Sequence, residues 1–293
     1  MEQVMVLCQT LVAGVTMGAI YTLIAMGLNL IANATRIVNF SQGNMVTVGA
    51  LVYVSSSLTA KLPLPLSLIL TVLVTALAGL LLERAIIHPM VKRRISLGEV
   101  ILATIAFAGL LTNLSQLIWG KDALSAPPLF QVEAITLFGF SLLSQRLVII
   151  AATAVIVVLT VLFFEYTYLG KAMRAVAAEK DGAWLSGINV DRMTLLIFCA
   201  SAGLSGLAGL LIGPVAPVLT TMGLPLSVKG FSAAVIGGIG SGPGAVLGGL
   251  ILGLAESLGA YYVSSAYSEG TAIILLLMIL YLRPQGLLGG GTH

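Results

Sequence analysis

The chain has 293 residues, of which 58% are hydrophobic and only 9% are charged, and its formal net charge is +3. Soluble domains carry about 25% charged residues, so this chain cannot cover a water-facing surface and is predicted to be an integral membrane protein. Continuous apolar runs of about 20 residues predict α-helical spans rather than the alternating segments of a barrel. The positive charge requires no nucleic-acid partner, because the cations cluster in short loops, where they set topology.

Composition also argues against several kinds of chemistry. Cys8 and Cys199 are the only cysteines, and both lie in apolar runs without the spacing of metal ligands or of a disulfide framework. The chain has no phosphate-binding G-x-x-x-x-G-K-[ST] motif and no paired nucleophile and base. We therefore expect no catalytic residue, no metal, no bound cofactor and no enzymatic activity of the chain itself.

The predicted fold class is an all-α polytopic membrane protein with about eight transmembrane helices plus broken or re-entrant segments, in a single transmembrane domain over residues 1–293. The first apolar run is too long for a signal peptide and is expected to remain as a helix. The predicted spans are Val6–Ile31, Gly43–Ala60, Pro65–Ile87, Val100–Trp119, Leu147–Tyr166, Met193–Gly213, a Gly-rich tract Lys229–Val263, and Thr271–Leu282.

Loop charges orient these spans. The loops His88–Glu99 and Thr167–Arg192 are rich in lysine and arginine, which predicts that both are cytoplasmic. Two spans separate them, as loops on the same side require. The intervening loop, residues 120–146, is then external, and the same count places the N-terminus outside.

The segment Arg36–Asn44, "RIVNFSQGN", lies between the first two predicted spans. An arginine and several amides are unfavourable in lipid, so these polar groups need a specific use. One interpretation is that they cap and satisfy a break between two helices. The other is that Gln42 and Asn44 line an uncharged cavity that offers hydrogen bonds of both senses.

The Gly-rich tract, residues 229–263, is too long for one crossing and too short for two. A half-helix that enters, breaks near the membrane midplane and returns fits this length. The glycines favour either close helix packing or an unwound segment that lines a cavity. A formal G-x-G-x-x-A match at Gly240–Ala245 is not a dinucleotide site, because it lacks a preceding strand. Glu256 in this tract is either a structural group or a functional one.

The loop Thr167–Arg192 contains a predicted short helix, Lys171–Leu185, with Gly187 as its stop. It mixes charges of both signs with apolar side chains. One interpretation is an interfacial helix that lies on the headgroups with Trp184 as its anchor. The other is a helix that docks into a groove on a cytoplasmic protein.

This loop, "TYLGKAMRAV … AWLSGINVDR", resembles the cytoplasmic coupling loop of permeases from bacterial branched-chain amino acid ABC importers, including their urea and amide relatives. The resemblance covers nearly the whole chain. Further matching segments are Gly18–Ile31, "RIVNFSQGN", Leu82–Pro89, Val235–Ser257 and Leu282–Gly289. Together these motifs are specific, whereas each alone is weak.

The resemblance implies a permease subunit in the bacterial inner membrane that pairs with a second homologous permease as a heterodimer. Two cytoplasmic ATPases and an external substrate-binding protein are the implied partners, and no nucleic acid is. The implied coupling residues are Lys171, Arg174, Ala175, Glu179, Asp181 and Gly187. The implied substrate pathway comprises Asn39, Phe40, Gln42, Gly43 and Asn44 on one side, and Phe231, Gly237, Gly238, Gly240 and Gly242 on the other.

One departure bears on the substrate. The family often has Asn-Phe-Ala-His-Gly-Glu where this chain has Asn39-Phe40-Ser41-Gln42-Gly43-Asn44, so a titratable pair is replaced by amides. The resemblance implies a branched-chain amino acid as the solute, whereas this departure argues against carrying over leucine and admits a similar small polar solute that is less charged or differently shaped. The alternative is an ion-coupled secondary transporter that uses Glu256, and an intramembrane enzyme is disfavoured because no catalytic set is found.

Overall fold

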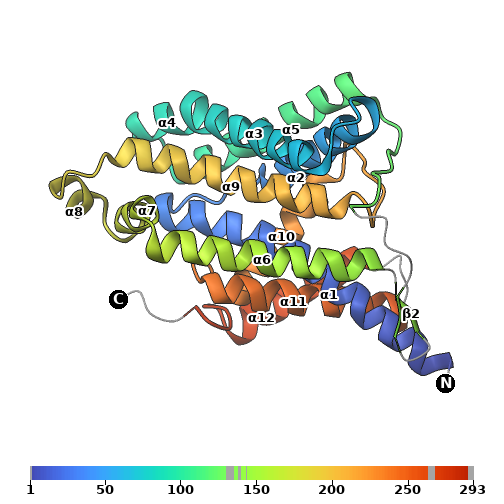
Figure 1. Ribbon diagram of the computed structural model, residues 1–293. Helices are drawn as coiled ribbons and strands as arrows, with labels where there is room; N and C mark the ends of the chain where they lie inside the picture. The colour runs from blue at the N-terminus through green and yellow to red at the C-terminus, as the bar shows by residue number, and fades with distance from the viewer. Residues whose placement is uncertain (1, 130–134, 138–139, 143, 263–267, 290–293) are drawn as a thin grey trace.

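The computed structural model describes residues 2–129, 135–137, 140–142, 144–262 and 268–289, and consists almost entirely of long helices that lie roughly side by side (Figure 1). The helices are α1 (Glu2–Thr35), α2 (Gln42–Val54), α3 (Leu64–Leu82), α4 (His88–Lys92), α5 (Leu97–Trp119), α6 (Ser144–Tyr166), α7 (Tyr168–Ala178), α8 (Lys180–Leu185), α9 (Val190–Ile212), α10 (Gly223–Gly237), α11 (Gly242–Tyr262) and α12 (Ser268–Leu282). Two π-helical turns, η1 (Ser55–Thr59) and η2 (Glu83–Ile87), extend α2 and α3.

Each predicted span overlaps one or two helices in the residues that the structure describes, which confirms the all-α polytopic class. Six helices in the described residues are long and apolar enough to cross a membrane, and α10 and the apolar part of α12 are shorter. The loop predicted to be external adds a small hairpin, in which β1 (Ile135–Leu137) pairs antiparallel with β2 (Phe140–Leu142). Part of that loop lies outside the described residues.

Local sequence signals explain several helix boundaries. Ser96 and Glu99 form a reciprocal capping box at the start of α5, and Pro65 occupies the first turn of α3, where its missing N–H is not needed. Thr167 accepts a hydrogen bond from the Gly170 amide at the start of α7, and Asn189 accepts one from the Arg192 amide at the start of α9. These caps satisfy amides that the helices leave unpaired.

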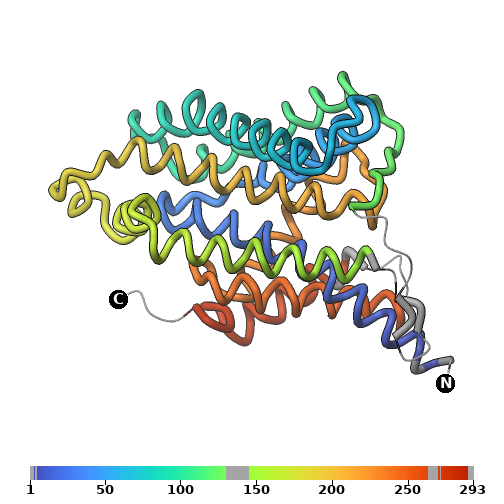
Figure 2. Tube along the Cα trace, viewed as in Figure 1, coloured from blue at the N-terminus to red at the C-terminus, as the bar shows by residue number. Residues whose placement is uncertain are grey.

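The centre of the molecule is formed by α1, α2, α9, α10 and α11. The helices α1 and α11 lie side by side over much of their length, the blue and orange tubes of Figure 2. Glycines allow this close approach: a Cβ on Gly18 would lie 2.8 Å from the carbonyl oxygen of Gly249, and one on Gly249 would lie 2.6 Å from the backbone nitrogen of Thr22. The packing role considered for this glycine tract is thus confirmed at Gly249.

The outer helices expose apolar side chains. Leu73 on α3 is 62% exposed, Leu102 on α5 is 64% exposed and Ile274 on α12 is 69% exposed. Soluble proteins rarely expose such continuous apolar surfaces, whereas a bilayer covers them. These faces fit a protein embedded in lipid.

The two cation-rich loops lie at the same end of the helix bundle, as their charge predicted. The helices α4, α7 and α8 gather at that end, and the N-terminal part of α1 lies at the opposite end with β2 (Figure 1). We call the first the coupling end and the second the hairpin end. The relative placement of these loops therefore agrees with the topology inferred from the sequence.

Two helix predictions were wrong. The single helix expected over Lys171–Leu185 is interrupted at Glu179, whose extended backbone separates α7 from α8. The Gly-rich tract does not begin at Lys229, because α10 already starts at Gly223, and the returning helix α11 has 21 residues, enough for a full crossing. The break between them lies beside the last turns of α1, rather than halfway along it.

Candidate substrate pathway and coupling helices

The α1–α2 break is made by the segment that first appeared as an unfavourable polar interruption. Helix α1 ends at Thr35, and Arg36 adopts a left-handed conformation with φ of 59° that turns the chain back toward the bundle. The Asn39 side chain accepts hydrogen bonds from the amide and the hydroxyl of Ser41, at 3.0 and 2.6 Å. This local bonding supports the capping interpretation of the segment.

Gln42 connects the start of α2 to α9. Its side-chain amide donates to the hydroxyls of Ser201 and Ser205, at 2.9 and 2.6 Å, and the side chain is fully buried. The Ser201 hydroxyl in turn donates to the carbonyl oxygen of Gly27 on α1, at 2.7 Å. A single amide thus joins three helices at the point where α2 begins.

Asn44 and Ser227 make two further connections. Asn44 donates to the carbonyl oxygen of Ala108 and to the hydroxyl of Thr112, both on α5. The Ser227 hydroxyl on α10 donates to the carbonyl oxygen of Phe40 at 2.7 Å and accepts from the amide of Gly43 at 2.9 Å. The α1–α2 break is therefore fastened to α5, α9 and α10.

The predicted pathway residues fall into two groups. Asn39, Gln42, Gly43 and Asn44 are buried, whereas the half-buried rings of Phe40 and Phe231 face each other with centroids 5.6 Å apart. Gly237 ends α10, about 9 Å along the helix from Phe231 at 1.5 Å per residue. Gly238 and Gly240 lie in the break that follows, and Gly242 begins α11. Phe231 of the second group packs against Phe40 of the first, and the role of all these residues in a pathway stays a prediction.

The α10–α11 break depends on glycines with positive φ. Gly238 and Gly240 have φ of 105° and 92°, which side chains with a Cβ rarely adopt. The Ser241 hydroxyl accepts from the amide of Gly244, and the side chains of Asn29 and Asn33 donate to the carbonyl oxygens of Ser241 and Gly240. Polar groups of α1 thus satisfy the unwound backbone between the two helices.

The C-terminal segment completes this break. The amides of Leu287 and Leu288 donate to the carbonyl oxygens of Ile236 and Gly237, each at 2.9 Å. These carbonyls belong to the last turn of α10 and have no partner within the helix. The "RPQGLLG" signature therefore acts as a strap over the end of α10, a role that the sequence alone did not suggest.

An ion pair within the helices was also missed by sequence reasoning. Lys229 on α10 pairs with Glu256 on α11, and the hydroxyl of Tyr21 on α1 donates to the same carboxylate at 2.7 Å. The lysine lies 5.7 Å from the centre of the Tyr21 ring, within the range of a cation–π contact. Lys229 is 27 residues from Glu256 in the chain, so no local sequence pattern indicates the pair.

The predicted coupling residues lie mainly on an exposed surface of α7 and α8. Helix α7 buries Ala172, Met173 and Val176, and packs against α1, α6 and α9. The charged side chains on the other faces are exposed, namely Lys171, Arg174, Glu179 and Asp181. Ala175 is half-buried between these faces, and Gly187 follows α8 with φ of 80°. The amphipathic pattern is confirmed, and its use in docking stays a prediction.

A helical bundle with two broken segments and an apolar exterior defines a multi-pass membrane protein. The chain belongs to the family "Branched-chain amino acid transport system / permease component", whose model matches residues 10–282. That family was the one indicated by the coupling-loop and break motifs.

Similar proteins cover the chain almost completely. It is 32% identical to the high-affinity branched-chain amino acid transport system permease protein LivH of Escherichia coli K12, over 98% of this chain and 97% of that protein. It is 31% identical to BraD of Pseudomonas aeruginosa, described by the same words, over 96% and 95% of the two chains. The solved structure of PsaBC from Streptococcus pneumoniae in complex with Fab matches with a TM-score of 0.52 and 14% identity, over 95% of this chain and 92% of that one, which shows the fold alone.

Proposed function

We propose that the chain is the permease subunit of an ABC importer that moves a branched-chain amino acid, or a similar small polar solute, into the cytoplasm. The observation that carries this proposal is the arrangement of α7. Its apolar face is held by three helices of the bundle, while its charged face, with Lys171 and Arg174, is exposed. The full-length similarity to amino acid permeases supports the same conclusion.

The assembly that we propose has four kinds of subunit, of which the two permeases lie in the bacterial inner membrane. This chain pairs with a second homologous permease as a heterodimer, two cytoplasmic ATPases hydrolyse ATP, and an external binding protein delivers the solute. The chain itself supplies the pathway and binds no nucleotide. The absence of a P-loop motif from its sequence supports this division of labour.

The hydrogen bonds provide a route by which ATPase movement reaches the breaks. Helix α7 packs on α9, and α9 carries Ser201 and Ser205, which hold Gln42 at the start of α2. The same α2 start is tied to α10 through Ser227. A shift of α7 against the bundle would therefore move the polar groups around both sides of the proposed pathway together.

Reconstitution tests this proposal. The chain is placed in proteoliposomes with and without the partner permease and ATPases, and uptake of labelled leucine, isoleucine and valine is measured with the binding protein outside. We expect uptake only from the complete complex and only with ATP inside. Accumulation by this chain alone, driven by a proton or sodium gradient, would refute the importer model.

The secondary-transporter alternative has one structural observation in its favour. Lys229, Glu256 and Tyr21 form a titratable cluster among helices that are buried in the bundle. Such clusters occur in proton-coupled transporters. However, Lys229 and Glu256 neutralise each other's charge, and a secondary transporter would have no use for the exposed charged surface of α7. The importer is therefore the better supported function.

A further inference from the structure

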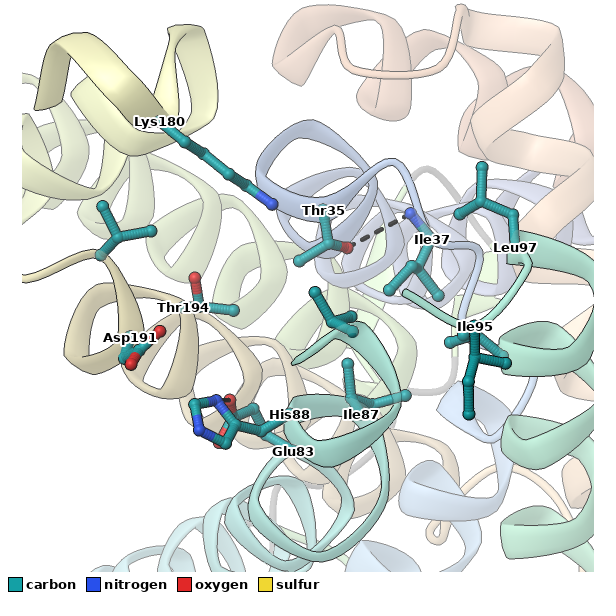
Figure 3. Close-up of a pocket in the computed structure, with 13 residues that line it drawn as sticks. Thr35, Ile37, Glu83, Ile87, His88, Ile95, Leu97, Lys180, Asp191 and Thr194 are labelled. Atoms are coloured by element: carbon teal, nitrogen blue, oxygen red, sulfur yellow. Dashed lines mark hydrogen bonds and ion pairs between the residues drawn. The ribbon is translucent and has the colours of Figure 1, made fainter. Parts of the chain in front are cut away.

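A cavity of about 330 Å³ opens at the coupling end of the molecule (Figure 3). Its wall is formed by the end of α1, by η2 and α4, by the start of α5, and by α8 and the start of α9. It is separate from the pathway residues, none of which lines it. Small-molecule sites in proteins have volumes of about 300–1,000 Å³, so this cavity has room for one small ligand.

Most of the wall is apolar. Its apolar side chains come from four parts of the chain and include Ile37, Ile87, Val91, Ile95, Leu97 and Val100. Ile37 and Ile87 are almost fully buried, whereas Leu97 is 53% exposed at the edge. A branched aliphatic group entering the cavity would remove apolar surface from water on both partners, at roughly 25 cal/mol per Å².

One side of the cavity carries two acidic side chains, Glu83 and Asp191. The Glu83 side chain is only 2% exposed, and its Oε1 lies 3.6 Å from Nδ1 of His88. Its other oxygen, Oε2, is buried and has no hydrogen-bond partner among the residues that the structure describes. Asp191 at the start of α9 also lines the cavity. Glu83 and Asp191 thus place two carboxyl groups, both hydrogen-bond acceptors, on this side of the cavity.

The other side carries a lysine. Lys180, the first residue of α8, extends its ammonium group toward Thr35 across the mouth of the cavity (Figure 3). Desolvation by the surrounding protein lowers the pKa of Lys180, and repulsion from Arg36 lowers it further. Lys180 forms no salt bridge within the described part of the chain. A carboxylate placed beside this lysine would relieve both effects.

We propose that this cavity binds an aliphatic amino acid from the cytoplasmic side. The ligand's carboxylate pairs with Lys180, its ammonium group lies beside the carboxyl groups of Asp191 and Glu83, and its side chain lies against the apolar wall. A zwitterion with a branched apolar side chain matches all three surfaces, whereas an amine or a fatty acid matches only two.

Occupancy has a consequence for transport. The ligand would bridge α8, in the coupling segment, to η2 at the end of α3 and to the start of α9. A ligand that binds one arrangement of these elements more tightly favours that arrangement. Accumulated amino acid would therefore hold α8 in place and slow further uptake. That the ligand and the transported solute belong to one class rests on the proposed function.

The complete complex in proteoliposomes, with its ATPases inside, tests this inference. The liposomes are preloaded with leucine, and the initial rate of uptake from outside is measured. We expect internal leucine to lower the rate, and we expect neither leucinamide, which lacks the carboxylate, nor 4-methylpentanoate, which lacks the ammonium group, to do so. Equal inhibition by all three compounds would overturn the assignment of a zwitterion site.

Variants locate the effect in the cavity. Lys180→Gln and Glu83→Gln should each raise the internal leucine concentration for half-inhibition about tenfold or more. Leu97→Trp fills the edge of the cavity without changing a charge, and keeps the test decisive if Glu83→Gln does not fold. The matched controls Lys92→Gln and Glu165→Gln remove exposed charges that do not line the cavity. Inhibition that is unchanged in the three cavity variants would refute the proposal.

A direct measurement of leucine binding tests the cavity site independently of the proposed transport function. Labelled leucine is equilibrated with the detergent-purified complex in the absence of ATP and binding protein. Binding that is lost in Lys180→Gln and Leu97→Trp supports the cavity site even if the complex transports no amino acid. Binding that persists in both variants places the ligand elsewhere and refutes it, even if uptake of leucine is confirmed.

Discussion

Lys229 and Glu256 form an ion pair between α10 and α11, and the hydroxyl of Tyr21 on α1 completes the shell around the carboxylate. The two charged side chains are 14% and 13% exposed. The pair thus joins the short helix of a broken segment to the two long helices beside it. Its position suggests a structural role for a carboxylate whose purpose the sequence left open.

Removing one partner of this pair should be more damaging than removing both. Lys229→Met leaves Glu256 without its counter-ion, and breaking a buried pair in this way costs about 3–5 kcal/mol. In the double variant Lys229→Met/Glu256→Gln, the amide keeps an acceptor for Tyr21 and no charge is left unpaired. We expect the melting temperature of the purified protein to be lower for the single variant than for the double variant. The reverse order would show that the pair is not a stability element.

Arg174→Glu should uncouple ATP hydrolysis from transport without changing the fold, because Arg174 is exposed on α7. We expect uptake by the complete complex to fall at least about tenfold. The free energy of unfolding should change by less than about 1 kcal/mol, so the melting temperature should stay close to that of the unsubstituted protein. Lys121→Glu, an exposed charge reversal in the loop predicted to be external, is the matched control. Normal uptake by Arg174→Glu would remove α7 from the proposed ATPase interface.

Gln42→Leu should destabilise the protein, because the hydroxyls of Ser201 and Ser205 lose a buried partner. The expected loss is about 1–3 kcal/mol per unsatisfied group. Uptake of all tested solutes should fall by the same factor, since the buried amide packs against protein rather than an open cavity. A changed order of preference among leucine, isoleucine and valine would instead show that Gln42 contacts the solute.

Gly249→Val should disrupt the packing of α1 against α11. A Cβ at this position lies 2.6 Å from a backbone nitrogen of Thr22, so the two helices must separate. Adding atoms to a well-packed contact typically costs about 1–3 kcal/mol of stability, and more when the helices cannot relax. Gly109→Ala on α5, where a Cβ meets nothing within 4 Å, is the control and should not lower the melting temperature. Equal melting temperatures for the two variants would contradict this role of Gly249.

Sequence patterns predicted the parts of the structure that depend on hydrophobicity and loop charge. The positions of the spans follow from the requirement that backbone N–H and C=O groups pair with each other in lipid. That the two basic loops share one end follows from the excess of lysine and arginine in cytoplasmic loops. The break at Arg36–Ser41 was also predictable, because its polar residues are unfavourable within an apolar helix. These are local properties, and each can be recognised within about 20 residues.

Long-range pairings were not predictable in this way. Gln42 with Ser201, Ser227 with Phe40, and Lys229 with Glu256 join residues that are far apart in the chain. Serines and a lysine in an apolar tract signal that partners exist, but only the packing of the helices selects which ones. The start of α10 was missed for a related reason, since Gly223–Val228 contains proline and glycine and resembles a loop until its tertiary contacts are known.

The strap of Leu287 and Leu288 over the end of α10 sets an order of events during biosynthesis. About 50 residues separate the last carbonyls of α10 from the amides that cap them, so at roughly 5–20 residues per second α10 waits some seconds for its cap. Until Leu288 has left the ribosome, the unwound glycines stay open to water or to chaperones. The end of α10 is therefore closed only after all the long helices have been made.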